Sequence, residues 1–373
     1  MESEIYIHIP FCLKKCKYCA FNSIVGTDAL IESYVNALCT EINSQSSDLD
    51  VKTIYIGGGT PTLLSIAHIK KIFETIGNKF NLKHCLEVTM EANPGTVNEK
   101  YFYELRQLGV NRISLGVQSF DDELLKLIGR IHNRSEAIAS VNNAKKLFNN
   151  VSIDLMYGLP SQTLDNLKDS IDIAASLDVE HVSIYGLEIE EGTEFFKLHS
   201  QNKLNLPTED EAVEMYDYIV DRLPKCGWWR YEISNFAKSG FESQHNLGYW
   251  SDVKYIGFGA GAHSYDGFRR KSNVKSVSEY INGIINGRDV SLLEEEITTQ
   301  AAMEEFCFLA LRTVDGININ KFKQKFGVDI KIIFGNAINK LKRQNLIDIT
   351  NDRIKLTDYG MKFGNIAFAE FLI

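Results

Sequence analysis

Three of the seven cysteines lie close together near the start of the chain, in the spacing C-x3-C-x2-C. They are Cys12, Cys16 and Cys19, and they follow an apolar run over residues 5–9 that is typical of a strand. A structural zinc site needs four protein ligands, and the motif holds no fourth cysteine. A cubane cluster has four irons, so three thiolates leave one iron open. The motif therefore indicates a reactive metal centre; a zinc knuckle or three buried thiols are the alternatives.

An aromatic residue, Tyr18, stands directly before the third cysteine. With this residue, the motif resembles that of the radical S-adenosylmethionine (SAM) superfamily. The resemblance implies a [4Fe–4S] cluster held by Cys12, Cys16 and Cys19, whose open iron is chelated by the amino and carboxylate groups of SAM. In that superfamily, an electron from the cluster cleaves SAM and releases a 5′-deoxyadenosyl radical.

The elements that must position this loop alternate between short apolar runs and amphipathic segments. Runs typical of strands cover residues 4–8, 53–56, 86–90, 112–115, 151–155 and 181–185. Helical spacing covers residues 29–44, 65–79, 98–108, 121–128, 135–148 and 163–177. This alternation predicts parallel βα units. We expect an α/β fold with a partial (β/α)6 TIM-like barrel, and a doubly wound open sheet is the alternative.

The notable motifs all follow predicted strands, at the end of a barrel where chemistry gathers. Gly57, Gly58 and Gly59 end the second strand, and a backbone without Cβ atoms can approach a ligand closely. A plain tight turn is the alternative for these glycines taken alone. Because polar motifs follow most of the other strands as well, we expect one site built from successive loops.

The motifs G-G-G-T-P-T, E-A-N-P-G, G-V-Q-S-F and D-L-M-Y-G-L-P resemble, in this order, those of the coproporphyrinogen dehydrogenase-like family of radical SAM proteins. Carboxylates at strand ends can accept hydrogen bonds from ribose hydroxyls, and an arginine can pair with a carboxylate through two hydrogen bonds. By this resemblance, the residues that contact SAM are Tyr6, Tyr18, Gly58, Gly59, Thr60, Glu91, Gln118, Arg130 and Asp154.

A later motif, H-N-L-G-Y-W over residues 245–250, places a histidine beside two aromatic residues. A histidine on an aromatic wall could ligate haem iron, whereas a hydrogen-bonded core histidine is the usual alternative. The motif resembles the H-N-x-x-Y-W haem-binding signature of the haem chaperones in the same family. It implies His245 as the iron ligand, with Tyr249 and Trp250 against the haem. We expect His263 to be structural or pocket-lining, and His8 to support the cysteine loop.

Composition limits the function classes. No apolar run approaches the roughly 20 residues that span a membrane, and we see no signal peptide. The net charge of −9 argues against broad nucleic-acid binding, which needs a basic face. The four other cysteines are scattered singly and are expected to be buried thiols in a reducing compartment, so we expect a cytoplasmic protein.

The last part of the chain no longer alternates between strands and helices. Helical patterns at residues 298–312, 319–326 and 331–344 precede two short strands at 346–349 and 353–356, which predicts a winged-helix-like α+β domain. Such a fold is often associated with DNA, but fold does not imply function. We expect three parts: a radical SAM partial barrel over 1–190, an extension with the H-N-L-G-Y-W motif over 191–295, and the winged-helix-like domain over 296–373.

Two functions compete within the resembled family. Coproporphyrinogen dehydrogenases carry a fourth cysteine two residues after the third and a long segment before the cluster, whereas this chain has Phe21 there and eleven residues before Cys12. Both differences favour a haem chaperone, although chaperones often have an acidic residue where this chain has Ala20. The alternative is an oxygen-independent coproporphyrinogen III oxidase, and a redox-sensing DNA-binding regulator is a distant third.

The resemblance to the chaperones also implies cofactors and partners. It implies a [4Fe–4S] cluster, SAM and haem as the bound groups. The expected partners are haem-accepting proteins, including membrane-associated respiratory ones, and an electron donor such as a flavodoxin or ferredoxin. No nucleic acid is expected, and a homodimer is left open.

Overall fold

The computed structural model describes residues 2–26, 28–46 and 49–373. Its centre is a twelve-stranded sheet with the order β14-β13-β12-β11-β1-β4-β5-β6-β7-β8-β10-β9. The six predicted strands stand side by side in this sheet, parallel and in chain order. They are β1 (Glu2–Ile9), β4 (Asp50–Gly58), β5 (Glu87–Ala92), β6 (Arg112–Gln118), β7 (Val151–Tyr157) and β8 (His181–Gly186).

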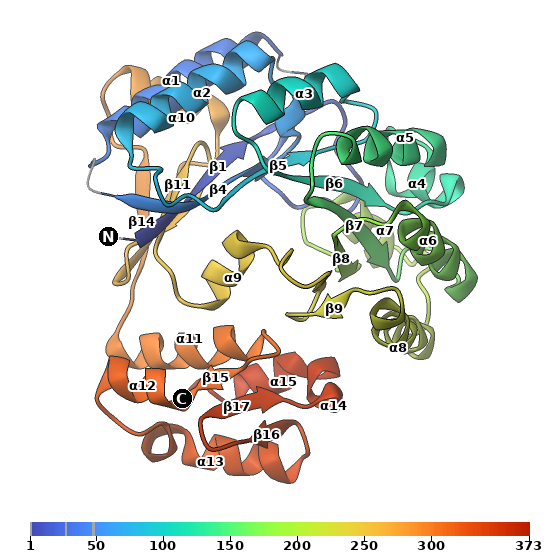
Figure 1. Cartoon of the computed structure of the whole chain (residues 1–373), viewed down its shortest axis with the longest axis vertical. Helices are drawn as coiled ribbons and strands as arrows, with labels where there is room; N and C mark the ends of the chain where they lie inside the picture. Colours follow the sequence, from blue (N-terminus) through green and yellow to red (C-terminus); the bar gives the residue numbers. More distant parts are fainter. Residues whose placement is uncertain (1, 27, 47–48) are drawn as a thin grey trace.

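Amphipathic helices follow these strands and cover one face of the sheet, as Figure 1 shows. They are α1 (Ile31–Ser44), α2 (Ile66–Lys79), α3 (Glu99–Gln107), α4 (Asp122–Ile128), α5 (Arg134–Lys145) and α6 (Leu164–Leu177). Strands that pair in chain order through right-handed crossovers place every connecting helix on the same side. A doubly wound sheet reverses its strand order and has helices on both faces. The open sheet is therefore the predicted partial barrel.

Alternation along β1 explains how polar groups come to face the inside of this partial barrel. Ile5, Ile7 and Ile9 have no exposed surface and belong to the main hydrophobic core. The alternate residues Tyr6 and His8 make polar contacts with each other instead, from the hydroxyl to the imidazole Nδ1 over 3.0 Å. Because successive side chains of a strand point to opposite faces, the apolar set lies under the helices and the polar set lies within the concave face.

The segment between β8 and the final domain supplies strands to both ends of the sheet. Near β8 it forms α7 (Glu194–Ser200), α8 (Glu209–Lys225), β9 (Trp229–Arg230) and β10 (Asn235–Ala237). It then forms α9 (Gln244–Trp250), β11 (Tyr255–Phe258), β12 (His263–Tyr265), β13 (Arg269–Asn273), α10 (Val277–Ile285) and β14 (Ser291–Glu296). Strand β10 pairs with β8, whereas β11 pairs with β1, about 250 residues away along the chain. Sequence periodicity predicted none of these short strands.

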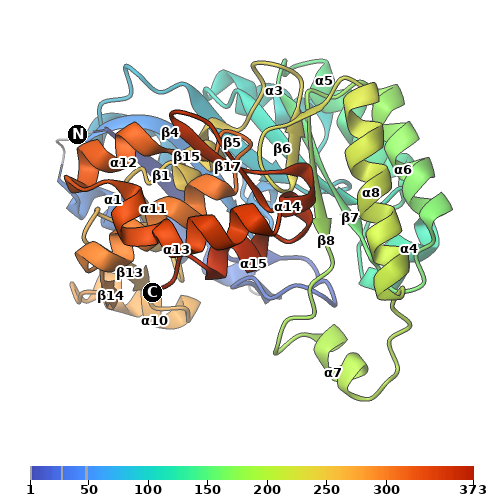
Figure 2. The ribbon, with the colours of Figure 1, turned by 90° about the horizontal axis from the view of Figure 1, so that it is seen from below.

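The last part of the chain has a hydrophobic core of its own. Its three-stranded sheet has the order β15-β17-β16, and Figure 2 shows it with its helices from below. The elements are α11 (Thr299–Leu311), β15 (Ile317–Asn318), α12 (Ile319–Phe326), α13 (Ile330–Arg343), β16 (Ile347–Ile349), β17 (Arg353–Leu356), α14 (Asp358–Lys362) and α15 (Gly364–Ala369). The predicted winged-helix-like arrangement is confirmed, and β15 adds a third strand. The boundaries at 190/191 and 295/296 stay predictions.

Helix α9 lies between the concave face of the sheet and the final domain (Figure 1). Within the described part of the chain, no helix is long and apolar enough to cross a membrane.

Candidate functional site

The cysteine loop begins where β1 ends and is held at several points. β2 (Phe11–Cys12) pairs with β3 (Ile24–Val25), which closes the loop at its base. The backbone N–H of Lys17 donates to the carbonyl of Ile128 at 3.0 Å, which fixes the middle of the loop against α4. All three cysteines are free thiols and line one cavity of about 320 Å³. The loop therefore carries its three sulfurs to a single enclosed space.

The glycine turn after β4 approaches this loop more closely than a side chain would allow. A Cβ atom on Gly59 would lie 2.7 Å from the carbonyl of Phe11 and 3.0 Å from the sulfur of Cys12. Gly58 has φ of +115°, and a Cβ there would lie 2.6 Å from the imidazole of His8. Next in the chain, the hydroxyl of Thr60 donates to the sulfur of Cys12 at 3.7 Å. The glycines are thus required for the turn to pack against the cysteine loop.

Two carboxyl groups of the lining come from other strands, Glu91 near the end of β5 and Asp154 in the middle of β7. Glu91 on β5 accepts hydrogen bonds from the Tyr55 hydroxyl at 2.7 Å and from the Gly58 N–H at 3.1 Å. Burial raises the pKa of Glu91 to about 7, against the opposing effect of its Tyr55 hydrogen bond. Asp154 on β7 accepts from the hydroxyl of Ser114 at 3.2 Å, and burial raises its pKa as well. Both groups can accept hydrogen bonds from ligand hydroxyls.

Two arginines supply positive charge to the same cavity. Arg130, after α4, donates to the sulfur of Cys16 at 3.5 Å and also contacts Asn93 and the carbonyl of Gly116. Arg112 at the start of β6 is 2% exposed, and its Nε and Nη1 have no hydrogen-bond partner within the described chain. Buried guanidinium groups with unused donors are costly unless a ligand accepts from them.

The structure brings most of the predicted SAM residues together. The cavity lining includes the three cysteines together with Tyr18, Gly58, Gly59, Thr60, Glu91, Gln118, Arg130 and Asp154. Tyr6 is absent from this lining; its ring stacks on Tyr55 with centroids 6.2 Å apart, and it lines a second, larger cavity. Sequence reasoning missed several other lining residues. Asn93 and Asn246 lie within quoted motifs but were not assigned to the site, and the strands supply others that lie in no motif: Tyr55, Arg112, Ser183 and Tyr185.

His245, the predicted haem ligand, lies in the protein interior. Its side chain is 1% exposed, Nδ1 is hydrogen-bonded to the Thr53 hydroxyl at 2.7 Å, and Nε2 to the Tyr249 hydroxyl at 3.0 Å. Its ring also stacks on Tyr55 with centroids 5.1 Å apart. Burial lowers the pKa of His245 to about 3, so the imidazole is neutral near pH 7. In this conformation both ring nitrogens are hydrogen-bonded, and His245 as the iron ligand stays a prediction of the motif.

The other residues of the H-N-L-G-Y-W motif fix α9 to the sheet. A Cβ on Gly248 would lie 1.8 Å from Oε1 of Glu4, so only glycine allows this approach. The carboxylate of Glu87 accepts from the backbone N–H of Gln244 at 2.8 Å, at the first turn of α9. A negative charge at this position stabilises the start of a helix. This segment therefore attaches α9 to the sheet, in addition to supplying the candidate haem ligands.

Helix α9 separates the first cavity from a second one. Asn246 lines the cavity of the cysteines, whereas Tyr249 and Trp250 line the second cavity, which has a volume of about 780 Å³. Its walls come from β1, the cysteine loop, residues 252–275 and Leu309 of the final domain. The two cavities share Lys15, Phe21 and Ser23 of the cysteine loop. A ligand in either cavity would therefore lie against that loop.

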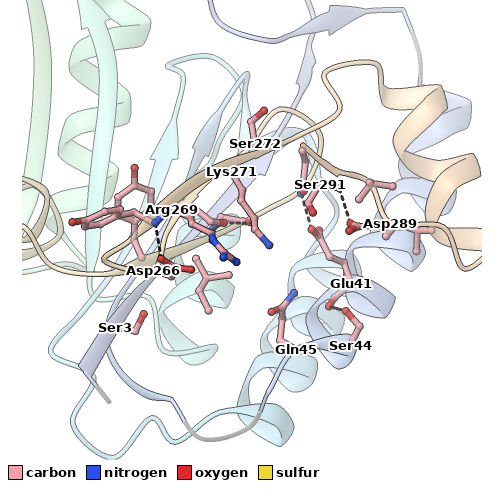
Figure 3. A pocket seen from close by; sticks show the side chains of 18 of the residues that line it. Ser3, Glu41, Ser44, Gln45, Asp266, Arg269, Lys271, Ser272, Asp289 and Ser291 are labelled. Carbon is pink, nitrogen blue, oxygen red and sulfur yellow. Dashed lines mark hydrogen bonds between the residues drawn. The ribbon is translucent and has the colours of Figure 1, made fainter. Parts of the chain in front are cut away.

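A third cavity, of about 570 Å³, holds none of the predicted residues. Figure 3 shows its polar lining, with Arg269 and Lys271 from β13 on one side and Glu41, Ser44 and Gln45 at the end of α1 on the other.

Comparisons with known proteins place this geometry in a family. Residues 6–174 match the family model of the radical SAM superfamily, and residues 297–363 match that of the HemN C-terminal domain. The Bacillus subtilis protein named heme chaperone HemW is 41% identical over 98% of each chain. The chain belongs to the HemW family. The HemW protein of Lactococcus lactis is 39% identical over 100% of this chain and 97% of its own.

A solved structure supports the fold of this HemW family member. The coproporphyrinogen III oxidase HemN of Escherichia coli superposes with a TM-score of 0.87, covering 100% of this chain and 90% of that one. The two sequences are 22% identical, so the likeness concerns the fold. The partial barrel with its C-terminal domain, predicted from the sequence, is confirmed.

Proposed function

We propose that this protein is a haem chaperone that binds a [4Fe–4S] cluster, SAM and haem, and delivers haem to acceptor proteins. The similarity to proteins named heme chaperone HemW, over nearly the full length of the chain, carries the proposal. Two adjoining cavities support it, because one is lined by the cysteines and the other is large and aromatic.

The cysteine cavity suits a cluster by the chemistry of its donors. Three free thiols line it, and polar hydrogens of Thr60 and Arg130 are directed at the sulfurs of Cys12 and Cys16. Such donors stabilise thiolates, which are the form that binds iron. Among the described residues, no three His, Cys, Asp or Glu side chains are arranged to share a single metal ion, whereas a cubane cluster binds each cysteine through a different iron. We propose that Cys12, Cys16 and Cys19 hold the cluster.

The remaining lining suits SAM, a zwitterionic ligand with ribose hydroxyls. We propose that Glu91 and Asp154 accept hydrogen bonds from the hydroxyls and that Arg130 pairs with the carboxylate. The glycine turn offers backbone groups at close range, beside Tyr18, Thr60 and Gln118. When bound, the cluster supplies the electron with which members of this superfamily cleave SAM. These residues hold and orient SAM, and Tyr6 supports them through the stacking of its ring on Tyr55.

The iron ligand implied by the motif is His245, with Tyr249 and Trp250 against the haem. For His245 to bind iron, the Tyr249 hydroxyl would have to leave Nε2 and α9 would have to open toward the second cavity. His245 can therefore ligate iron only after a conformational change, whereas a histidine that already faces a cavity would need none.

The expected partners and location belong to the same proposal. Haem-accepting proteins, including membrane-associated respiratory ones, would receive the cargo, and a flavodoxin or ferredoxin would donate electrons. A homodimer and a cytoplasmic location remain predictions of the sequence.

The proposal can be tested on the full chain under anaerobic conditions. After iron–sulfur reconstitution, haem is titrated optically, and coproporphyrinogen is offered with SAM and a reductant. We expect about one haem per chain and no decarboxylated product. The variant Cys16→Ser should lose cluster iron, whereas the matched control Cys85→Ser should keep it. Turnover of coproporphyrinogen without stoichiometric haem binding would instead establish the oxidase.

A further inference from the structure

We propose that haem binds in the second cavity, with the imidazole of His263 as its iron ligand. This inference rests on the proposed function and adds the place and the ligand of the cargo. It differs from the motif-based expectation, in which His245 ligates the iron. In this proposal, His245 is a positioning residue that holds α9 in place.

The second cavity has the size and the walls that a macrocycle needs. Its volume of about 780 Å³ lies in the upper part of the range for ligand sites, about 300–1,000 Å³. Six aromatic side chains line it: Tyr6, Phe21, Tyr249, Trp250, Tyr255 and Tyr265. Flat apolar rings provide the contact that a porphyrin face requires. The cysteine cavity, at about 320 Å³, is smaller and more crowded with charges.

Two histidines line the second cavity, and only one presents an unbonded nitrogen in the described structure. His8 is hydrogen-bonded through Nδ1 to the Tyr6 hydroxyl and through Nε2 to the carbonyl of Asn22. His263 is the first residue of β12, is exposed, and has no side-chain hydrogen bond among the described residues. A neutral imidazole with a free nitrogen is the usual protein ligand of haem iron.

The glycine-rich turn before β12 explains why His263 faces this space. A Cβ on Gly261 would lie 2.6 Å from the side-chain nitrogen of Asn22, so the turn and the cysteine loop touch. That nitrogen donates to the carbonyls of Ala260 at 3.0 Å and Lys275 at 2.9 Å. The turn is thereby attached to the cysteine loop on one side, and His263 projects at the rim of the cavity beside it.

Charges on the lining suit the two propionates of haem. Lys15 and Lys275 are exposed lysines of the lining, from the cysteine loop and from the segment after β13. Arg270 is already paired with Glu305 through both Nη atoms, and Asp252 is paired with Lys325. The lining thus offers two lysines for carboxylates, while its one acidic side chain is neutralised by an ion pair.

The test compares histidine variants in haem titrations of the reconstituted full chain. We expect His263→Ala to weaken haem binding at least about tenfold and to change the Soret band, because the axial ligand is lost. Added imidazole should restore the band of this variant. The control His199→Ala, whose exposed side chain lies on α7 outside the lining of the cavity, should bind as the wild type does.

A second variant separates the two candidate ligands. His245→Gln keeps hydrogen-bonding groups toward Thr53 and Tyr249 and should retain the wild-type haem spectrum. If this variant loses the spectrum and His263→Ala keeps it, His245 is the ligand and the present inference is wrong, while the chaperone function stands. If the wild type binds no stoichiometric haem, the proposed function itself fails.

A double variant tests the two lysines. Replacing both Lys15 and Lys275 with Met should weaken haem binding several-fold without shifting the Soret band, because the axial ligand is intact. Iron protoporphyrin dimethyl ester, which lacks the carboxylates, should bind the wild type and this double variant equally. An unchanged affinity of the double variant for haem would contradict the proposed orientation.

Discussion

At the scale of single residues, the site depends on its glycines as much as on its polar side chains. Gly59 and Gly248 each stand where a Cβ would overlap a neighbour, at the cysteine loop and at Glu4 respectively. Glu4 and His245 lie in the same buried polar cluster, with Nδ1 of the imidazole 3.8 Å from Oε2 of the carboxyl group. The packing of the cysteine loop and of α9 therefore depends on the lack of a Cβ at these glycines and on the protonation state of Glu4.

The first prediction concerns Gly59. In Gly59→Ala, the new methyl group would meet the Phe11 carbonyl and the Cys12 sulfur, so the loop must shift and cluster assembly should fall several-fold. Iron and sulfide content after reconstitution measures this effect. Gly77→Ala in α2, where no atom lies within 4 Å of the new Cβ, is the control and should assemble normally. A fully loaded Gly59→Ala would contradict the proposed packing.

The second prediction concerns the pH dependence of stability. Burial, with a smaller contribution from Glu87, raises the pKa of Glu4 from 4.5 to about 8. The folded chain therefore keeps a proton that the unfolded chain releases, so this group lowers stability as the pH rises from 4.5 to 8.

Replacing the carboxyl with an amide removes this loss. We expect Glu4→Gln to be more stable than the wild type by about 1–3 kcal/mol at pH 8, with a smaller difference at pH 5. Urea unfolding at both pH values measures the difference. The surface substitution Glu74→Gln should show no such trend, and a pH-independent difference for Glu4→Gln would argue against a protonated Glu4.

At the scale of elements, the short helix α9 connects the parts of the site. Its first turn meets the carboxylate of Glu87 on β5, its middle packs on Glu4 of β1, and its end carries Trp250 under the guanidinium of Arg312, 4.4 Å from the ring centroid. A helix of seven residues has little stability alone, so tertiary contacts must hold it. The separation of the two cavities therefore depends on this attachment.

The third prediction concerns this attachment. Gly248→Ala should displace α9 from Glu4 and cost about 1–3 kcal/mol of stability, because a well-packed interface has no room for the methyl group. Thermal unfolding and haem titration measure the two consequences. Gly335→Ala in α13, with open space around the new Cβ, should be neutral or slightly stabilising. Equal effects of the two substitutions would show that α9 is not tightly attached.

At the scale of the whole molecule, the final domain forms part of the wall of the second cavity. Its helix α11 contributes Leu309 to that wall and contacts α9. Arg270 on β13 pairs with Glu305 on α11 through two hydrogen bonds, across the junction between the large sheet and this domain. The enclosure of the cavity therefore depends on how the domain is attached.

The fourth prediction concerns this junction. A double-mutant cycle of Arg270→Gln and Glu305→Gln should give a coupling free energy of about 1–3 kcal/mol, because both side chains are largely shielded from water. Urea unfolding supplies the four values. The exposed pair Lys225 and Asp221 on α8 serves as a control and should couple by less than about 0.5 kcal/mol. Additive effects of the two junction substitutions would contradict a structural role for the pair.

The sequence by itself determined the repeating part of this protein. Residues 53–56 and 112–115, for example, lie within β4 and β6, because each stretch alternates a polar or aromatic residue with a buried aliphatic one, which is the pattern of a strand. The cysteine spacing and the motifs at the strand ends depend on a few adjacent residues, and parallel strands bring those ends to one edge. Local patterns were therefore sufficient to predict the partial barrel, together with the cysteines and the motif residues that line the cysteine cavity.

Only the tertiary structure decided how the H-N-L-G-Y-W motif and the second cavity are arranged. Thr53, the partner of His245, lies 192 positions away, and no local pattern predicts that contact. The same holds for β11 beside β1, which brings His263 near the cysteine loop. The burial of a polar side chain depends on partners that are distant in sequence. Hydrophobic periodicity predicts only which face of a helix or strand is buried, and not which residues will contact it. The place of each histidine therefore followed from the packing of the whole chain.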